Sequence, residues 1–270
     1  MSPSLQVTSI HLRVADLARS VEFYAGQLGF TVLNSSAGRA ALAPATGTQA
    51  PAPDKADGIL ALTEERAARP APREAAGLFH AALLLPSRAA LGAWLRLATE
   101  RGVGFHGCSD HGVSEALYFA DPDGNGLEFY ADRARATWPF ASNGELAMDT
   151  RPLDLPSLLA AAPAASPAPL TGARWGHLHL RVTDLERSEK FYRATLGVAL
   201  TQGTFPGARF LAADGYHHHI GLNIWGRPRA PQPPGALGLA EATFARAGIA
   251  APQSLRDPDG IAVKIVAQAG

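Results

Sequence analysis

One pattern of apolar and polar positions occurs twice along the chain. In residues 10–30, IHLRVADLARSVEFYAGQLGF, an alternating stretch typical of a β-strand ends at Asp16, and apolar residues then recur at the spacing of an amphipathic helix. Residues 178–198, LHLRVTDLERSEKFYRATLGV, repeat the pattern with Asp184 in the same place. Both aspartates suit helix N-caps, because their carboxylates can accept from the free N–H groups of the first turn. Each copy therefore predicts a strand followed by a helix.

Weaker copies of the same unit follow each strong one. Residues 77–86, GLFHAALLLP, predict a strand, residues 87–102, SRAALGAWLRLATERG, a helix, and residues 115–130, EALYFADPDGNGLEFY, a β-hairpin. In the fourth unit, residues 239–248, LAEATFARAG, favour a helix, and residues 255–266, LRDPDGIAVKIV, a closing hairpin. The stretch before it is too rich in Pro and Gly for a first strand, so this unit is predicted to be shortened.

The units together predict an α+β fold of four βαβββ modules in two tandem domains. Residues 1–132 would form an N-terminal domain of two modules, and residues 175–270 a C-terminal domain whose second module is shortened. Residues 133–174 lie between them, and their second half is rich in Ala and Pro. That composition is typical of a linker with at most a short helix.

The composition is that of an ordinary globular protein without a charge bias. Hydrophobic residues make up 47% of the 270 residues, and 24 Lys and Arg balance 24 Asp and Glu, so neither nucleic acid nor an anionic membrane is indicated as a partner. The apolar runs are short, and the N-terminus has no basic and apolar leader, which together predict a cytoplasmic protein. The single Cys108 excludes an internal disulfide and a cysteine-based metal cluster.

Three consecutive histidines lie in residues 215–223, GYHHHIGLN. If this segment is a strand, successive side chains point to opposite faces, so His217 and His219 share a face and His218 lies on the other. The triplet alone therefore cannot supply three ligands to one ion. The pattern leaves a metal site, an acid–base site and three solvated imidazoles as alternatives.

The motifs HLRVADLARSVEFY, HLRVTDLERSEKFY and DPDGNGLEFY resemble those of the vicinal oxygen chelate superfamily, which includes glyoxalases, bleomycin-binding proteins and extradiol dioxygenases. The resemblance covers nearly the whole chain apart from residues 133–174. It implies two tandem glyoxalase/dioxygenase-like domains whose modules pair their sheets into cupped half-barrels. A metal would lie inside a cup, held by the first and last strands of the modules.

A finer resemblance lies in residues 110–128, DHGVSEALYFADPDGNGLE. This stretch is similar to the signature of extradiol ring-cleaving enzymes, with His111, Tyr118 and Glu128 at its characteristic positions. GYHHHIGLN likewise resembles the strand that supplies their acid–base histidine, and the register with those strands favours His218. The nearest subgroup is the bacterial catechol-2,3-dioxygenase-like proteins with two such domains.

The resemblance implies an iron site made of two histidines and one carboxylate. First strands would supply the histidines and a last strand the Glu, which gives His80 and Glu128 in the second module and His177 in the third. The matching positions of the first and fourth modules are Ser9 and Lys264, which cannot complete a site. We therefore expect modules two and three to share the metal-holding cup, and modules one and four to form a second cup without a complete site.

Each candidate also has an ordinary structural interpretation. His80 could be a hydrogen-bonded core histidine, Glu128 part of a common ion pair, Tyr118 a core aromatic residue and His111 a turn residue. His179 and its counterpart His11 are expected to be structural, because the first module has no other candidate ligand.

The function implied by the resemblance is Fe(II)-dependent extradiol cleavage, with Mn(II) as the alternative metal. A small catechol-type aromatic and O₂ would be the substrates, and a muconic semialdehyde-type compound the product. His218 would accept and return a proton, while Tyr118 and His111 would hydrogen-bond the substrate oxygens. The alternatives are a glyoxalase-type metal-dependent isomerase or thiol transferase, and a metal-free protein that binds an aromatic drug. Because the superfamily often dimerises, a homodimer is the candidate assembly.

Overall fold

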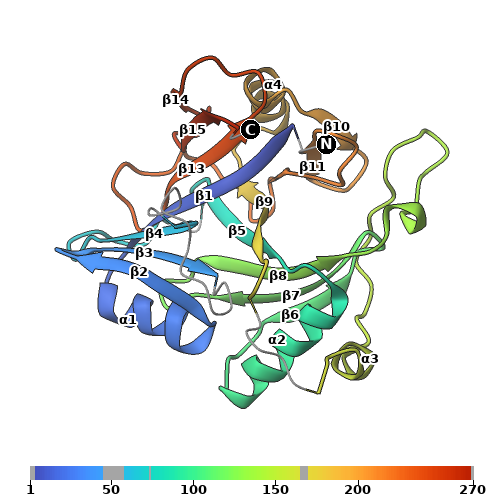
Figure 1. Ribbon diagram of the computed structural model, residues 1–270. Helices are drawn as coiled ribbons and strands as arrows, with labels where there is room; N and C mark the ends of the chain where they lie inside the picture. The colour runs from blue at the N-terminus through green and yellow to red at the C-terminus, as the bar shows by residue number, and fades with distance from the viewer. Residues whose placement is uncertain (1–3, 45–57, 73, 165–169, 269–270) are drawn as a thin grey trace.

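Two mixed β-sheets organise the protein (Figure 1), of which the computed structural model describes residues 4–44, 58–72, 74–164 and 170–268. The first sheet has seven strands, in the order β14 (Gln253–Arg256), β15 (Ala262–Ala267), β13 (Gly238–Arg246), β1 (Leu5–Val14), β4 (Leu60–Glu64), β3 (Arg39–Pro44) and β2 (Phe30–Ser36). The second has eight, in the order β10 (Ala199–Gln202), β11 (Ala208–Ala212), β12 (Ile220–Asn223), β9 (Arg174–Arg181), β5 (Gly77–Leu84), β8 (Gly126–Asp132), β7 (Ser114–Ala120) and β6 (Gly107–Asp110).

The pairing of the modules follows from these strand orders. Strands β5 and β9, the first strands of modules two and three, pair antiparallel at the centre of the eight-stranded sheet. Strands β1 and β13 pair antiparallel in the other sheet and join modules one and four. The α+β fold of four modules is confirmed, and so is the expectation that module two shares its sheet with module three. The domain limits at residues 132 and 175 stay a prediction.

Module four differs from the prediction in one element. The stretch LAEATFAR, predicted as a helix, belongs to strand β13, which lies between β1 and β15. Leu239, Ala242 and Phe244 are buried, while Glu241 and Thr243 between them are half-buried. This alternation has a period close to two and matches a strand better than a helix. Among the described residues, the module therefore has a first strand, which was predicted to be missing, and has no helix, which was predicted to be present.

The predicted helices of the other modules are present. Asp16 accepts from the Arg19 amide at the start of α1 (Leu17–Val21), which continues as the π-helix η1 (Glu22–Gln27). Asp184 accepts from the Arg187 amide in the same way at α4 (Leu185–Leu196). Ser87 caps α2 (Arg88–Glu100) through the Ala90 amide. Asp16 and Asp184, the cap residues identified from the sequence, therefore start their helices, and Ser87 does the same for α2.

The two DPDG turns tie each strong module to the next one along the chain. Tyr24 of η1 donates its hydroxyl to Asp121 at 3.0 Å, and Tyr192 of α4 donates to Asp257 at 2.9 Å. In each turn the second aspartate accepts from the backbone just before a helix, as Asp123 does from the Ala15 amide at 3.0 Å. Because modules one and two lie in different sheets, these hydrogen bonds connect the sheets to each other.

The segment between the two predicted domains packs against the eight-stranded sheet. It contains the short helices η3 (Arg135–Thr137) and α3 (Leu155–Ala160). Its residues Trp138, Leu146 and Met148 are buried in one cluster with side chains of modules two and three. Within the described ranges, no helix has the length and apolar character needed to cross a bilayer.

Candidate metal centre and its cavity

One face of the eight-stranded sheet carries the predicted metal ligands. On β5, Ala82 lies opposite His177 of β9 on one side and opposite Glu128 of β8 on the other. His80, two residues before Ala82, points to the same face and lies opposite His179. The intervening residues of these three strands belong to the hydrophobic core. Strand alternation therefore separates the polar face from the core.

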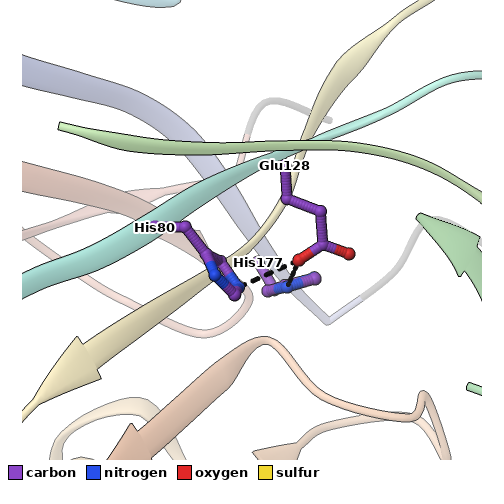
Figure 2. Close-up of side chains that lie close together, drawn as sticks. All are labelled: His80, Glu128 and His177. Carbon is purple, nitrogen blue, oxygen red and sulfur yellow. Dashed lines mark hydrogen bonds and ion pairs between the residues drawn. The ribbon is translucent and has the colours of Figure 1, made fainter. Parts of the chain in front are cut away.

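The structure brings His80, Glu128 and His177 together (Figure 2). One Glu128 oxygen, Oε2, lies 2.9 Å from His80 Nε2 and 3.1 Å from His177 Nε2. One possible ligand atom from each residue lies within 4.8 Å of the others, and all three side chains are buried. Two imidazoles and a carboxylate at this spacing form a donor set for a divalent transition metal.

The protonation states of this group suit metal binding. Burial opposes ionisation of Glu128, but the His177 and His80 imidazoles outweigh it and hold the pKa of Glu128 well below its usual value. Burial lowers the pKa of His177 to about 4, against the opposing effect of Glu128. Metal ions bind anionic carboxylates and neutral imidazoles, so these ligands are ready near neutral pH.

An unsatisfied nitrogen supports the fit of a metal ion. His80 Nε2 is buried and has no hydrogen-bond partner among the described residues, although Glu128 Oε2 is close to it. A buried polar atom without a partner is costly, and a metal ion bound by this nitrogen removes that cost. The ordinary alternative, a core histidine paired with Glu128 alone, differs from a metal ligand in needing no further partner for this nitrogen.

A cavity of about 260 Å³ opens above these residues. Tyr118 and His111 form part of its wall: His111 Nε2 lies 2.7 Å from the Tyr118 hydroxyl, and His111 Nδ1 lies 2.6 Å from the Asp149 carbonyl oxygen. A carbonyl only accepts, so a neutral His111 carries its proton on Nδ1 and accepts from Tyr118. Burial and the Glu128 carboxylate raise the pKa of Tyr118 well above its usual value, which keeps this hydroxyl protonated.

The three consecutive histidines are buried and have three different environments. They precede β12, which begins at Ile220, so the alternation of faces that a strand would impose does not apply to them. His218 lines the cavity, with its ring centroid 4.0 Å from that of His177. His217 Nε2 is 2.9 Å from Asp132, and His219 accepts from a backbone amide. Solvated imidazoles are excluded, because the exposed fractions of the three residues are 0%, 7% and 7%.

His179, for which a structural role is expected, lies next to the candidate ligands. Its side chain is buried in the cavity wall, and Nε2 has no hydrogen-bond partner among the described residues. Gly221 of β12 lies opposite it, and a Cβ there would come within 2.9 Å of the ring. His11, its counterpart in module one, lies in the seven-stranded sheet and is half-buried. Its Nε2 is 2.8 Å from the hydroxyl of Thr63 in the same sheet.

Sequence reasoning missed the apolar wall of the cavity. This wall consists of Phe79, Val113, Met148, Phe205, Phe210 and Trp225. Phe79 faces the cavity next to His80 because the pairing of β5 with β9 shifts by one residue between Leu78 and His80, which marks a β-bulge. Met148 comes from the segment predicted as a linker. No local pattern marks either residue as part of a site.

Comparison with known proteins agrees with this fold. The model of the Glyoxalase/Bleomycin resistance protein/Dioxygenase superfamily matches residues 6–129 and 174–251. A Bacillus subtilis (strain 168) protein named catechol-2,3-dioxygenase is 41% identical over 250 residues, which are 86% of this chain and 83% of that protein. Glyoxalase I from Zea mays superposes with a TM-score of 0.58 at 18% identity, over 98% of this chain and 92% of that chain. The cppA protein from Streptococcus pneumoniae does so with a TM-score of 0.54 at 12% identity, over 97% and 99%. At such low identity, the two structures show the shared fold alone.

Proposed function

Because the chain belongs to the glyoxalase/bleomycin resistance protein/dioxygenase superfamily, we propose that it is an extradiol dioxygenase, an enzyme that cleaves a catechol beside its two hydroxyls with O₂. The observation that carries this proposal is the convergence of His80, Glu128 and His177 at the floor of a cavity. The cytoplasm is the proposed location and a homodimer the proposed assembly.

His80, His177 and Glu128 would hold the metal, which we propose to be Fe(II), with Mn(II) as the alternative. A metal held by these three side chains would keep room for a substrate and O₂ on the cavity side. When bound, the iron supplies the redox chemistry that lets dioxygen react with an aromatic ring. The protein's own contribution is to orient the ring, exclude water and move protons.

His218 would take the proton from one catechol hydroxyl. It lines the cavity beside His177, so a hydroxyl bound near the metal ligands comes within its reach. Tyr118 and His111 form a hydrogen-bonded pair on another part of the wall, where they would bind a substrate oxygen. A muconic semialdehyde-type product would result.

The cavity favours an uncharged, apolar catechol. Six of the described residues that line the cavity are apolar. The described lining includes neither Lys nor Arg. Besides Glu128, the one carboxylate in the described lining of the cavity is Asp149, and its side chain is 60% exposed. A carboxylate on the substrate ring would therefore lose its hydration without gaining a counter-ion.

The direct test is anaerobic loading with Fe(II), removal of free metal, and addition of catechol in air. We expect a yellow ring-cleavage product and uptake of one O₂ per catechol, and no turnover by Glu128→Gln. Methylglyoxal with a thiol should not react, because a second buried carboxylate that could act as the base is absent from the described cavity wall. If iron-loaded protein turns over no diphenol, the proposal is wrong. If the protein instead binds aromatic drugs without a metal, it should purify without iron, and its affinity for catechol should not depend on added iron.

A further inference from the structure

Two hydrogen bonds run from the end of β8 to the wall of the cavity. His217 Nε2 lies 2.9 Å from Asp132 Oδ1, and His217 Nδ1 lies 2.7 Å from His218 Nδ1. His218 borders the cavity, and Asp132 borders a second cavity of about 270 Å³ behind the triplet. The three residues therefore connect the candidate active site to a second opening.

The chemistry of the partners determines which nitrogens carry protons. The ionised Asp132 carboxylate only accepts, so His217 carries a proton on Nε2. A neutral His217 then has a lone pair on Nδ1, and His218 must donate to it from its own Nδ1. For a neutral His218, the lone pair is consequently on Nε2. Among the residues that the structure describes, the ring of His218 is hydrogen-bonded through Nδ1.

The surroundings hold this arrangement in place. His217 is fully buried, and its ring centroid lies 4.0 Å from that of Tyr216 and 5.4 Å from that of Trp138. Tyr216 also donates its hydroxyl to Asp132 Oδ1 at 3.1 Å. The Tyr130 hydroxyl lies 2.7 Å from that of Tyr216, which fixes the position of Tyr216. Neither His217 nor Asp132 lines the main cavity, so neither would touch the substrate.

We infer that Asp132 and His217 are positioning residues that hold His218 in one orientation and one tautomer, with the Nε2 lone pair available to a substrate hydroxyl. The inference rests on the proposed function, in which His218 receives that proton. A histidine can act as a base only through an unprotonated nitrogen, so the opposite tautomer would present an N–H to the hydroxyl.

The tautomers can be measured without turnover. In ¹⁵N-histidine-labelled, metal-free, full-length protein, long-range ¹⁵N–¹H NMR distinguishes the protonated from the unprotonated nitrogen of each ring. We expect the Nε2–H form for His217 and the Nδ1–H form for His218, with signals assigned by their loss in His217→Phe and His218→Asn. An Nε2–H form of His218, or a His217 protonated on both nitrogens, would overturn the inference.

Variants at Asp132 then connect the tautomer to catalysis. Asp132→Leu removes the acceptor, whereas Asp132→Asn keeps an oxygen that His217 can still donate to. In the iron-loaded protein, Asp132→Leu should lower kcat by about 10–100-fold, with unchanged KM and iron content, and Asp132→Asn should restore most of that loss. Asp214→Asn is the matched control, because it removes a carboxylate that borders the same second cavity but is hydrogen-bonded to Ser4 rather than to His217, and it should keep kcat within about 3-fold.

The outcomes separate this inference from the proposed function. If Asp132→Leu does not fold, His217→Phe tests the same contact, since it keeps an aromatic ring but removes both nitrogens. Unchanged kcat in a folded variant of either kind would overturn the inference while extradiol activity stands. If the wild-type protein has no diphenol activity, the proposed function fails, and the inferred role of Asp132 and His217 fails with it, whatever tautomers are found.

Discussion

His219, the last histidine of the triplet, should make the metal-free protein sensitive to acid. Its side chain is buried, and its Nδ1 accepts from the Ala213 amide at 3.3 Å. Burial lowers the pKa of His219 from 6.5 to about 4. Protonation of Nδ1 would also place an N–H against the Ala213 N–H, so the folded protein holds this proton poorly.

The sign and size of the effect follow from proton linkage. Because the pKa of His219 is lower in the folded state, the unfolded chain takes up the proton first, and folding loses stability as the pH falls below about 6.5. The loss ends near the folded-state pKa of about 4. Between about pH 7.5 and about pH 4.5, these two pKa values correspond to a loss of about 2.5 kcal/mol from this one residue.

The variant His219→Asn separates this term from other acid effects. Its amide oxygen can take the place of Nδ1 as the acceptor for Ala213, but it does not titrate. Urea denaturation followed by circular dichroism at the two pH values gives the free energy of unfolding of each protein. The variant should lose about 2.5 kcal/mol less than the wild type over this range. His106→Asn, at an exposed histidine, should lose as much as the wild type. Equal losses in His219→Asn and the wild type would refute the reasoning.

Three further predictions concern the metal, the turns and the substrate. After loading and desalting, the iron content of Glu128→Gln, measured by atomic emission, should be at least about 10-fold lower than that of the wild type, because the anion facing His80 and His177 is lost. An iron content equal to that of the wild type would exclude Glu128 as a ligand. Tyr24→Phe and Tyr192→Phe should each lower the free energy of unfolding by about 1–3 kcal/mol in urea titrations, because each removes a donor to a buried aspartate; unchanged midpoints would refute this. In an oxygen-uptake assay, a catechol carboxylate should have a kcat/KM at least about 10-fold lower than methylcatechol, and equal values would contradict an uncharged-substrate cavity.

The module repeat and the pairing of modules two and three could be predicted from the sequence. The strand and helix pattern around Asp16 and Asp184 is local, because capping and periodicity depend on residues within a few positions. The pairing then followed from the ligand set that the family resemblance implies, because only modules two and three carry all of its members. Strands β5 and β9 do pair, and they bring His80 and His177 to one face.

The elements that were wrong or missed depend on contacts between distant residues. The stretch around Glu241 is rich in Ala, Glu and Arg, which favour helices, but its pairing with β1 and β15 makes it a central strand. Phe79 reaches the cavity through a β-bulge, a feature that depends on the register with β9. Met148 lies in a segment whose composition indicates a linker, and it is buried only because modules two and three leave an apolar surface for it.

The triplet shows most clearly why neighbouring residues of one type can have separate roles. The partners of its members lie far apart in the chain: Asp132 for His217, His177 for His218 and Ala213 for His219. The segment precedes β12, so strand alternation does not set the direction of these side chains, and each ring is placed by the element that it packs against. A triple substitution would therefore combine three effects: loss of the control of the His218 tautomer by His217, loss of His218 as the proton acceptor, and the change in acid stability that His219 causes. Single substitutions separate them, because only His218 borders the cavity that would hold the substrate.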